Sequence, residues 1–305
     1  MFNVNIISGS EGPTSSSNSN VDNNLGEQYS QFHEQKLVEK FCRESQLLKI
    51  IEGNINEFLG VYKRSQKREL ALAPLIIRLD FHFAQLRALA PQLLRLAIDE
   101  PLQFADAIKY SIYSLVRAQL KSAANDSGLK VIDITQVHTL WRFLDLPLHR
   151  QVLFDPNQHL YPFGLSLVHG ILSAFTTPET NILQSVWYCG SGCIRNAIQN
   201  ISTNAPPCSN CSRPMSEYAK LRITEPYRLI AVLPGACIQT PRTIDRIFRP
   251  IIVRIRAHTY DCKLKLGALY LATGYYCTTA TTYIFEACHL KEAQRLDASA
   301  LIPFS

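Results

Sequence analysis

Apolar residues recur at helical spacing through the first part of the chain. From Phe32 to Leu59 they stand three, four and seven positions apart, at Leu37, Phe41, Leu48, Ile51, Ile55 and Phe58. This spacing predicts a helix with one buried stripe. Gly60 is the expected end of that helix.

The next segments alternate between short apolar runs and helical patterns. PLIIRL at 74–79 is β-branched and predicts a strand, and the leucines of residues 80–98 predict a helix that Pro91 interrupts. Pro101 follows two acidic residues and marks the start of another helix, which continues towards Leu120 and ends in AANDSG at 123–128.

The pattern changes after Pro162. The runs LSLVHGILSAF, ILQSVWY, AKLRI, RLIAVL, IIVRIRA, ALYLATGYY and TTYIFEACHL are short, β-branched or aromatic, and separated by Gly, Pro and Thr. They predict a small β barrel or sandwich. The fold class is therefore α+β, with a helical N-terminal subdomain at 29–160 followed by a β subdomain at 161–305.

The composition is typical of a folded protein with its own hydrophobic core. Hydrophobic residues make up 47% of the 305 residues, enough for a core, and no run of about 18 apolar residues predicts a membrane helix. Residues 1–28 are rich in Ser, Asn and Gly, lack Lys and Arg, and are expected to be a disordered tail without targeting function. We expect an intracellular protein, in which nine cysteines do not form a disulfide framework.

Four cysteines form two pairs between the first β runs. Three residues lie between Cys189 and Cys193, two lie between Cys208 and Cys211, and fourteen lie between the two pairs. Two such knuckles can direct four thiolates at one tetrahedral Zn²⁺, which leaves no position for an activated water. We expect a structural zinc ribbon at about 187–216; the alternative is a degenerate site that has kept its cysteines. A catalytic zinc enzyme is disfavoured because no H-x-E motif is present.

Basic residues concentrate near the chain's β-rich end. The net charge is +6, and the segment from 242 to 265 carries five more basic than acidic residues. Single-stranded DNA binds OB barrels through a basic groove and stacked aromatics. The candidate stacking residues are Tyr270, Tyr275 and Tyr276. The candidate DNA contacts are Arg242, Arg246, Arg249, Arg254, Arg256, Lys263 and Lys265. The alternatives are a solvated strand face and a surface that pairs with an acidic partner.

The order of these parts resembles one known family. LIIRLDFHFAQLRALAPQLLRLAIDEP at 75–101, SLVHGILSAFTTPETNILQSVWYC at 166–189 and KLRITEP at 220–226 are similar to segments of the N-terminal domain of MCM (minichromosome maintenance) helicases. So are RPIIVRIRAHTYDCKLKLGALYLATGYY at 249–276 and TYIFEACHL at 282–290. The resemblance implies a helical subdomain followed by an OB-fold barrel with an inserted zinc ribbon.

Three departures from this family bear on function. MCM helicases continue into an AAA+ ATPase, whereas no G-x4-G-K-[ST] phosphate loop occurs in this sequence. The segment CTTATTY at 277–283 has no Lys or Arg where the family places a basic hairpin. The loop that we expect from Pro226 to Arg249 is longer than the family's by about a dozen residues.

A free-standing domain of this kind resembles one subunit of the split meiotic MCM-like complex. The resemblance implies a non-enzymatic protein of the nucleus and chromosomes, which pairs with a separate ATPase-like subunit and promotes meiotic crossovers by opposing an anti-crossover helicase. DNA is a further expected partner, whereas a membrane or a small-molecule substrate is not. The alternative is a stand-alone OB-fold protein that binds single-stranded DNA in replication or repair.

Overall fold

The chain folds into a mixed α+β structure with a closed, OB-like barrel of five strands. The computed structural model describes residues 33–65, 74–127, 132, 134–148, 153–154, 164–194, 197–199, 205–235, 249–278 and 283–293. The expected disordered tail therefore lies outside the described residues. Within the described part, no helix combines the length and the apolar character needed to cross a membrane.

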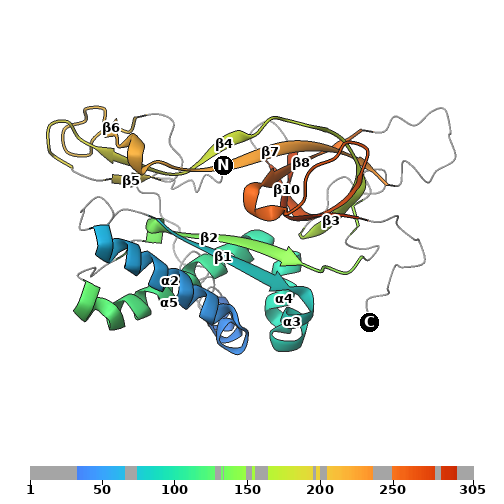
Figure 1. Cartoon of the computed structure of the whole chain (residues 1–305), viewed down its shortest axis with the longest axis horizontal. Helices are drawn as coiled ribbons and strands as arrows, with labels where there is room; N and C mark the ends of the chain where they lie inside the picture. The colour runs from blue at the N-terminus through green and yellow to red at the C-terminus, as the bar shows by residue number, and fades with distance from the viewer. Residues whose placement is uncertain are drawn as a thin grey trace, which may run out of the picture.

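The first half of the chain packs helices against one side of a two-stranded parallel sheet (Figure 1). The elements are a helix at 33–44, α2 (Leu47–Ser65), β1 (Leu75–His82), α3 (Phe83–Leu89), α4 (Pro91–Asp99), α5 (Pro101–Ser127), the 3-10 turn η2 (Ile134–Gln136) and β2 (Val137–Leu144). The expected helical subdomain is thus confirmed only in part. Sequence patterning missed β2, whose partner β1 lies more than fifty residues earlier in the chain.

The apolar stripe from Phe32 to Leu59 belongs to two helices and not to one. The first helical segment ends at residue 44, and the hydroxyl of Ser45 accepts a hydrogen bond from the backbone N–H of Leu47 at the start of α2. Serine commonly ends one helical run and caps the next in this way. The buried side is nevertheless continuous, because Phe41 precedes the break and Ile51 and Ile55 follow it.

Several predicted boundaries were wrong by a few residues. Gly60 does not end α2, which continues to Ser65, because the packing of its apolar face outweighs a glycine cost of about 1 kcal/mol. Strand β1 extends three residues beyond the predicted end, so the following helix begins at Phe83. The predicted interruption at Pro91 is confirmed, with Pro91 in the first turn of α4. Helix α5 begins at Pro101 as predicted but runs to Ser127.

The second half forms the barrel and a ribbon that projects from it. The elements are β3 (Ser166–Phe175), β4 (Glu179–Tyr188), β5 (Ala197–Gln199), β6 (Ser216–Glu217), η3 (Ala219–Leu221), β7 (Ile223–Pro234), β8 (Ile251–Arg256), η4 (Ala257–Thr259), β9 (Leu269–Thr278) and β10 (Tyr283–Glu292). Strands β3, β9, β10, β8 and β7 pair in that order, and β7 pairs back to β3. Among these five barrel strands only β8 and β10 pair in parallel, and this connectivity is that of an OB-like barrel.

The ribbon lies between the first and second strands of the barrel. Strand β4 pairs with the first part of β7 and then with β5 and β6, so the hairpin that follows β3 extends well beyond the barrel (Figure 1). The predicted loop from Pro226 to Arg249 needs correction, because Pro226 lies within β7, opposite Thr180. Residues 236–248 lie outside the described part.

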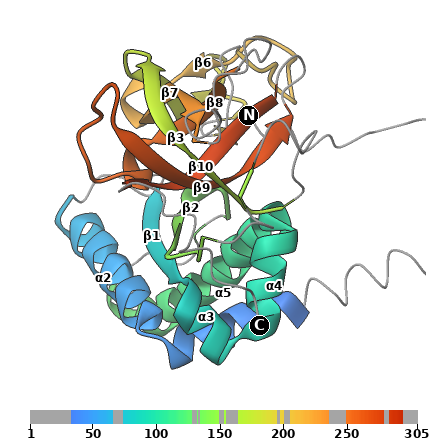
Figure 2. The ribbon, with the colours of Figure 1, turned by 90° about the vertical axis from the view of Figure 1, so that its right-hand side faces the viewer.

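A chain of aromatic rings joins the helices to the barrel. Phe41 stacks on Phe81 of β1, Phe81 meets Phe104 of α5 edge-on, and Phe104 meets Trp141 of β2 edge-on. Trp141 then stacks on Tyr275 of β9, with ring centroids 6.3 Å apart. Figure 2 shows the result, with the β1–β2 sheet lying between the helices and the barrel.

One arginine connects the same parts on the other face of this sheet. Arg142 of β2 donates from Nε and Nη2 to Asp80 of β1, at 2.7 and 2.6 Å, and from Nη1 to Asp261, at 2.7 Å. Asp261 follows η4 of the barrel. The hydrogen bonds from Arg142 hold the pKa of Asp80 below its usual value.

The close approach of β9 and β10 requires glycine at one position. A Cβ on Gly274 would collide with the backbone carbonyl oxygen of Glu286, whereas a Cβ on Gly53 of α2 would meet no atom within 4 Å. We expect Gly274→Ala to lower the free energy of unfolding by about 2–3 kcal/mol. The matched control Gly53→Ala should raise it by about 0.5–1 kcal/mol through helix propensity. Urea unfolding midpoints test both, and equal midpoints for the two variants would contradict the packing argument.

The Arg142 contacts predict a pH-dependent contribution to stability. A lowered folded-state pKa means that Asp80 stabilises the fold above its unfolded pKa of about 3.9 and loses this contribution as pH falls below it. Asp80→Asn should therefore cost about 1 kcal/mol at pH 7, because the side chain is 36% exposed, and the cost should vanish in acid. Asp261→Asn is the control, since Asp261 is 81% exposed. Unfolding curves at pH 7 would contradict this account if the two variants lost equal stability, and curves at acid pH would contradict it if Asp80→Asn kept its cost.

Candidate metal centre and basic strand

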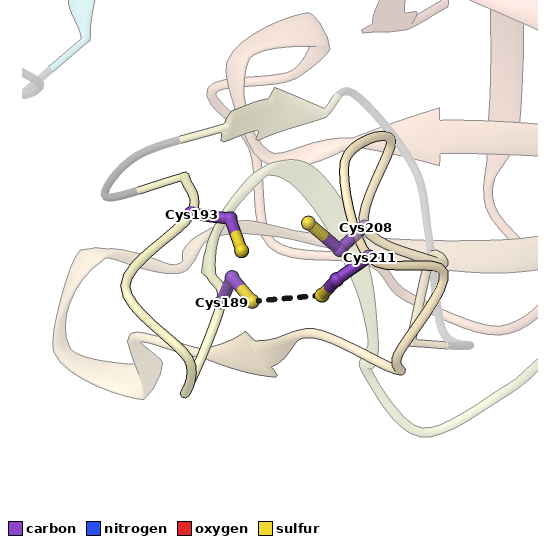
Figure 3. A group of neighbouring side chains, drawn as sticks. All are labelled: Cys189, Cys193, Cys208 and Cys211. Atoms are coloured by element: carbon purple, nitrogen blue, oxygen red, sulfur yellow. Dashed lines mark hydrogen bonds between the residues drawn. The ribbon is translucent and has the colours of Figure 1, made fainter.

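The four cysteines lie at the end of the ribbon, on two turns that face each other (Figure 3). Cys189 directly follows β4, and Cys208 and Cys211 precede β6. Strands β5 and β6 both pair with β4, so the two turns are held at one end of the same small sheet. Cysteines that are fifteen or more residues apart in sequence are thereby brought together.

Both turns close with the same backbone hydrogen bond although their cysteine spacings differ. The N–H of Cys189 donates to the carbonyl of Ile194, and the N–H of Cys208 donates to the carbonyl of Arg213, each at 2.8 Å and five residues along. Each turn has one residue in the left-handed region, Gly192 with a φ of 75° just before Cys193, and Ser212 with a φ of 55° just after Cys211. The wider first spacing is therefore compatible with a second knuckle of standard size.

The four sulfur atoms converge on one point. All four Sγ atoms lie within 4.8 Å of one another, and those of Cys189 and Cys211 are 3.6 Å apart. A tetrahedral zinc with Zn–S bonds of about 2.3 Å requires sulfur atoms about 3.8 Å apart. The group can therefore hold a metal ion, and the sequence-based choice of these four residues as one cluster agrees with the geometry.

The surroundings of the cluster contain few apolar side chains. Trp187 and Met215 are buried against Cys189 and Cys208, and Ile194 packs on them from outside. Together these side chains form one small apolar cluster. Cys189 and Cys208 are half of the buried residues in this apolar cluster, so the packing of Trp187 and Met215 depends on the cysteine side chains staying close together.

The thiols of the cluster differ in acidity. The backbone N–H of Ser191 donates to the sulfur of Cys189 and lowers its pKa to about 6. Its neighbour Cys193 has a pKa raised to about 11, chiefly through its hydrogen bond with Cys211. The thiolate of Cys189 thus forms readily, and its negative charge opposes the deprotonation of a neighbouring thiol. A bound cation would offset this repulsion between thiolates.

The remaining cysteines lie away from this cluster. Cys42 and Cys288 are buried, and burial raises the pKa of each thiol to about 12. The pKa of Cys277 is likewise raised, to about 11. Raised pKa values keep these thiols protonated and unreactive at neutral pH. All eight cysteines in the described part are free of disulfide bonds.

Comparison with known proteins does not assign the chain to a family. No protein-family model matches the chain, and no curated protein matches it. The functional argument therefore depends on the fold and on the contacts within it.

The predicted DNA-contacting residues do not form one open basic surface. Arg254 and Arg256 of β8 project on the outer side of the barrel, as predicted, but both donate to Glu286 of β10, at 3.2 and 2.7 Å. Lys265 lies 3.4 Å from both carboxylate oxygens of Glu292. Arg249 and Lys263 are exposed, and Arg242 and Arg246 lie outside the described residues.

The aromatic residues proposed for base stacking were a wrong choice. Tyr270 is 0% exposed inside the barrel, where its hydroxyl donates to the carbonyl of Lys263. Tyr275 is buried against Trp141, and Tyr276 packs edge-on against Phe285. Alternation along a strand does not reveal which face becomes the barrel interior and which meets another subdomain.

One buried histidine has no hydrogen-bond partner within the described part of the chain. His169 on β3 is buried, and neither of its ring nitrogens has a hydrogen-bond partner in the described part of the chain. Burial lowers its pKa, so the neutral imidazole is favoured.

The cluster predicts metal binding that depends on all four sulfur atoms. We expect the protein to bind Co²⁺ with the intense charge-transfer absorption of thiolate ligands, and Cys208→Ser to weaken binding at least about tenfold. Cys262→Ser is the control, because Cys262 lies outside the cluster. Absorption titrations measure both, and equal Co²⁺ affinity for the two variants would show that the cluster is not the metal site.

Proposed function

We propose that this chain is a zinc-stabilised, non-catalytic subunit that resembles the N-terminal domain of MCM helicases. It pairs with a separate ATPase-like subunit and acts on chromosomes in the nucleus. Its role there is in meiotic recombination, where it promotes crossovers by opposing an anti-crossover helicase.

The position of the cysteine ribbon in the fold is the observation that supports this proposal. The ribbon extends the hairpin between the first and second strands of an OB-like barrel, β3 and β7, behind a mainly helical subdomain that packs on the same barrel. This is the order of parts that the sequence segments suggested. An OB-like barrel alone is shared by many functions, so the combination of parts supports the proposal and the barrel by itself does not.

The zinc in this proposal is structural. Four thiolates complete a tetrahedral sphere and leave no position for water or substrate. Cys189 and Cys208 are buried in the small apolar cluster of the ribbon, so metal binding and folding of the ribbon are coupled. We expect the same chemistry to make the ribbon sensitive to chelators.

The contacts of the basic residues favour the subunit over a stand-alone single-stranded DNA-binding protein. Stand-alone binding requires cations that are free to meet phosphates and aromatic faces that are open to bases. Here Arg254 and Arg256 are already paired with Glu286, and Tyr270 and Tyr275 are buried. Affinity for DNA is therefore expected to come mainly from the assembled complex.

The proposed function predicts a specific partner. Affinity purification of the full chain from meiotic tissue should recover an ATPase-like chain together with about one equivalent of zinc. The purified chain alone should bind a single-stranded oligonucleotide weakly and with little dependence on salt.

Two results would contradict the subunit role. One is the absence of any ATPase-like chain from the purified material, and the other is tight, strongly salt-dependent binding of the oligonucleotide by the chain alone. The second result would favour the stand-alone DNA-binding function, and its control is a variant in which the exposed Arg249 and Lys263 are both replaced by Glu.

A further inference from the structure

A cleft of about 470 Å³ lies between the two-stranded sheet and the barrel. One wall is formed by side chains that β1 and β2 direct away from the helices, and the other by η4 and the parts of β4 and β7 nearest the ribbon. Its volume is within the range of about 300–1,000 Å³ that is usual for ligand sites. The cleft is therefore large enough to admit a side chain of another protein.

The charged side chains that line the cleft include three carboxylates and two guanidiniums. The carboxylates belong to Asp80, Asp261 and Glu225, and the guanidiniums to Arg78 and Arg142. Arg142 donates to both aspartates, and Arg78 stands two residues before Asp80 on the same face of β1. The positive charges of the lining therefore lie beside the aspartates, and neither guanidinium donates a hydrogen bond to Glu225.

Glu225 of β7 is a buried carboxylate with one oxygen that lacks a donor. Its side chain is 6% exposed, and its Oε1 atom contacts the Nδ1 atom of His258. Its Oε2 atom is also buried but accepts no hydrogen bond from any residue that the structure describes. Arg256 approaches this oxygen only to 3.8 Å, and the Nε atom of Arg256 already donates to Glu286 at 2.7 Å. Buried carboxylate oxygens are normally hydrogen-bonded, so a donor is missing at this point of the cleft wall.

Apolar side chains line the cleft beside Glu225. Pro226 follows it in β7, and Leu183 is the extra residue at the bulge where β4 pairs with β7. A β-bulge commonly redirects a side chain, and Leu183 is part of the cleft lining. Leu140 of β2 lines the opposite wall. Such a lining suits a lysine side chain, which buries its methylene groups on apolar surface and keeps its ammonium at a polar group.

The single open oxygen of Glu225 favours an ammonium over a guanidinium. A guanidinium binds a carboxylate best through two parallel hydrogen bonds, one to each oxygen. Because His258 already contacts Oε1, Glu225 cannot form that pair. An ammonium is a compact point charge that can donate to one acceptor.

We propose that this cleft is a docking site for a lysine side chain of a partner protein. The ammonium donates a hydrogen bond to Oε2 of Glu225, and the methylene groups pack among Leu140, Leu183 and Pro226. The positive charge of the lysine balances the third carboxylate of the lining. The site uses none of the four cysteines of the ribbon, so it is independent of the proposed metal centre and of the meiotic role.

The probe for this proposal is Nα-acetyl-lysine-methylamide, titrated into the full chain labelled at Leu methyl groups. We expect saturable shifts of the Leu140 and Leu183 methyl resonances. Nα-acetyl-norleucine-methylamide has a similar stem without the ammonium and should bind about five- to tenfold more weakly. Nα-acetyl-arginine-methylamide should bind about two- to threefold more weakly than the lysine probe, because only one oxygen is open to it.

Two variants remove negative charge from the lining. Glu225→Gln should weaken the lysine probe about five- to tenfold, because the amide keeps the shape of the side chain but not its charge. Asp261→Asn alters a side chain that is 81% exposed, and should weaken the probe about two- to threefold. Glu57→Gln is the control, because Glu57 is an exposed glutamate of α2 that does not line the cleft. It should leave the affinity unchanged, and unfolding midpoints show which variants fold.

Three results would overturn the proposal. The first is the absence of any saturable shift with the lysine probe, and the second is binding of the norleucine or arginine probe at least as tight as that of the lysine probe. The third is unchanged affinity for the lysine probe in Asp261→Asn. If Glu225→Gln folds, unchanged affinity in that variant overturns the proposal as well.

Discussion

The chain of aromatic rings through Trp141 is the contact on which the arrangement of the whole molecule depends. It begins in the first helix at Phe41, passes through β1, α5 and β2, and ends on Tyr275 of the barrel. Aromatic pairs contribute about 0.5–1.5 kcal/mol each beyond the area they bury. Because the rings come from five separate elements, the helical subdomain and the barrel share one apolar core.

This shared core determines which surfaces remain available for function. The outer faces of β9 and β10 are occupied by β2, so Tyr275 and Cys288 contribute to packing. On β8 and the neighbouring part of β10 the arginines Arg254 and Arg256 neutralise Glu286. Separating a buried carboxylate from the two arginines that hold it costs folding stability. Both guanidiniums are therefore occupied within the fold and are not available to a ligand.

The ribbon and the cleft depend on the barrel in different ways. The ribbon is a long extension of one barrel hairpin, and its end is organised locally by two cysteine turns and a few apolar side chains. The cleft has no local origin, because its walls come from α2, the β1–β2 sheet, β4, β7 and η4. A metal at the ribbon would therefore stabilise mainly the ribbon, whereas an occupant of the cleft would connect both halves of the molecule.

The sequence by itself determined the features that depend on residues close together in the chain. The buried stripes of the helices, the break at Pro91, the barrel strands and the four-cysteine group could all be predicted, because spacing along the chain fixes which side chains share a face. The tertiary structure alone decided that Val137–Leu144 pairs with β1, that Tyr270 points into the barrel, and that Arg142 joins Asp80 to Asp261. These features arise from contacts between residues far apart in the chain, and hydrophobic periodicity carries no information about which distant element will cover a given face.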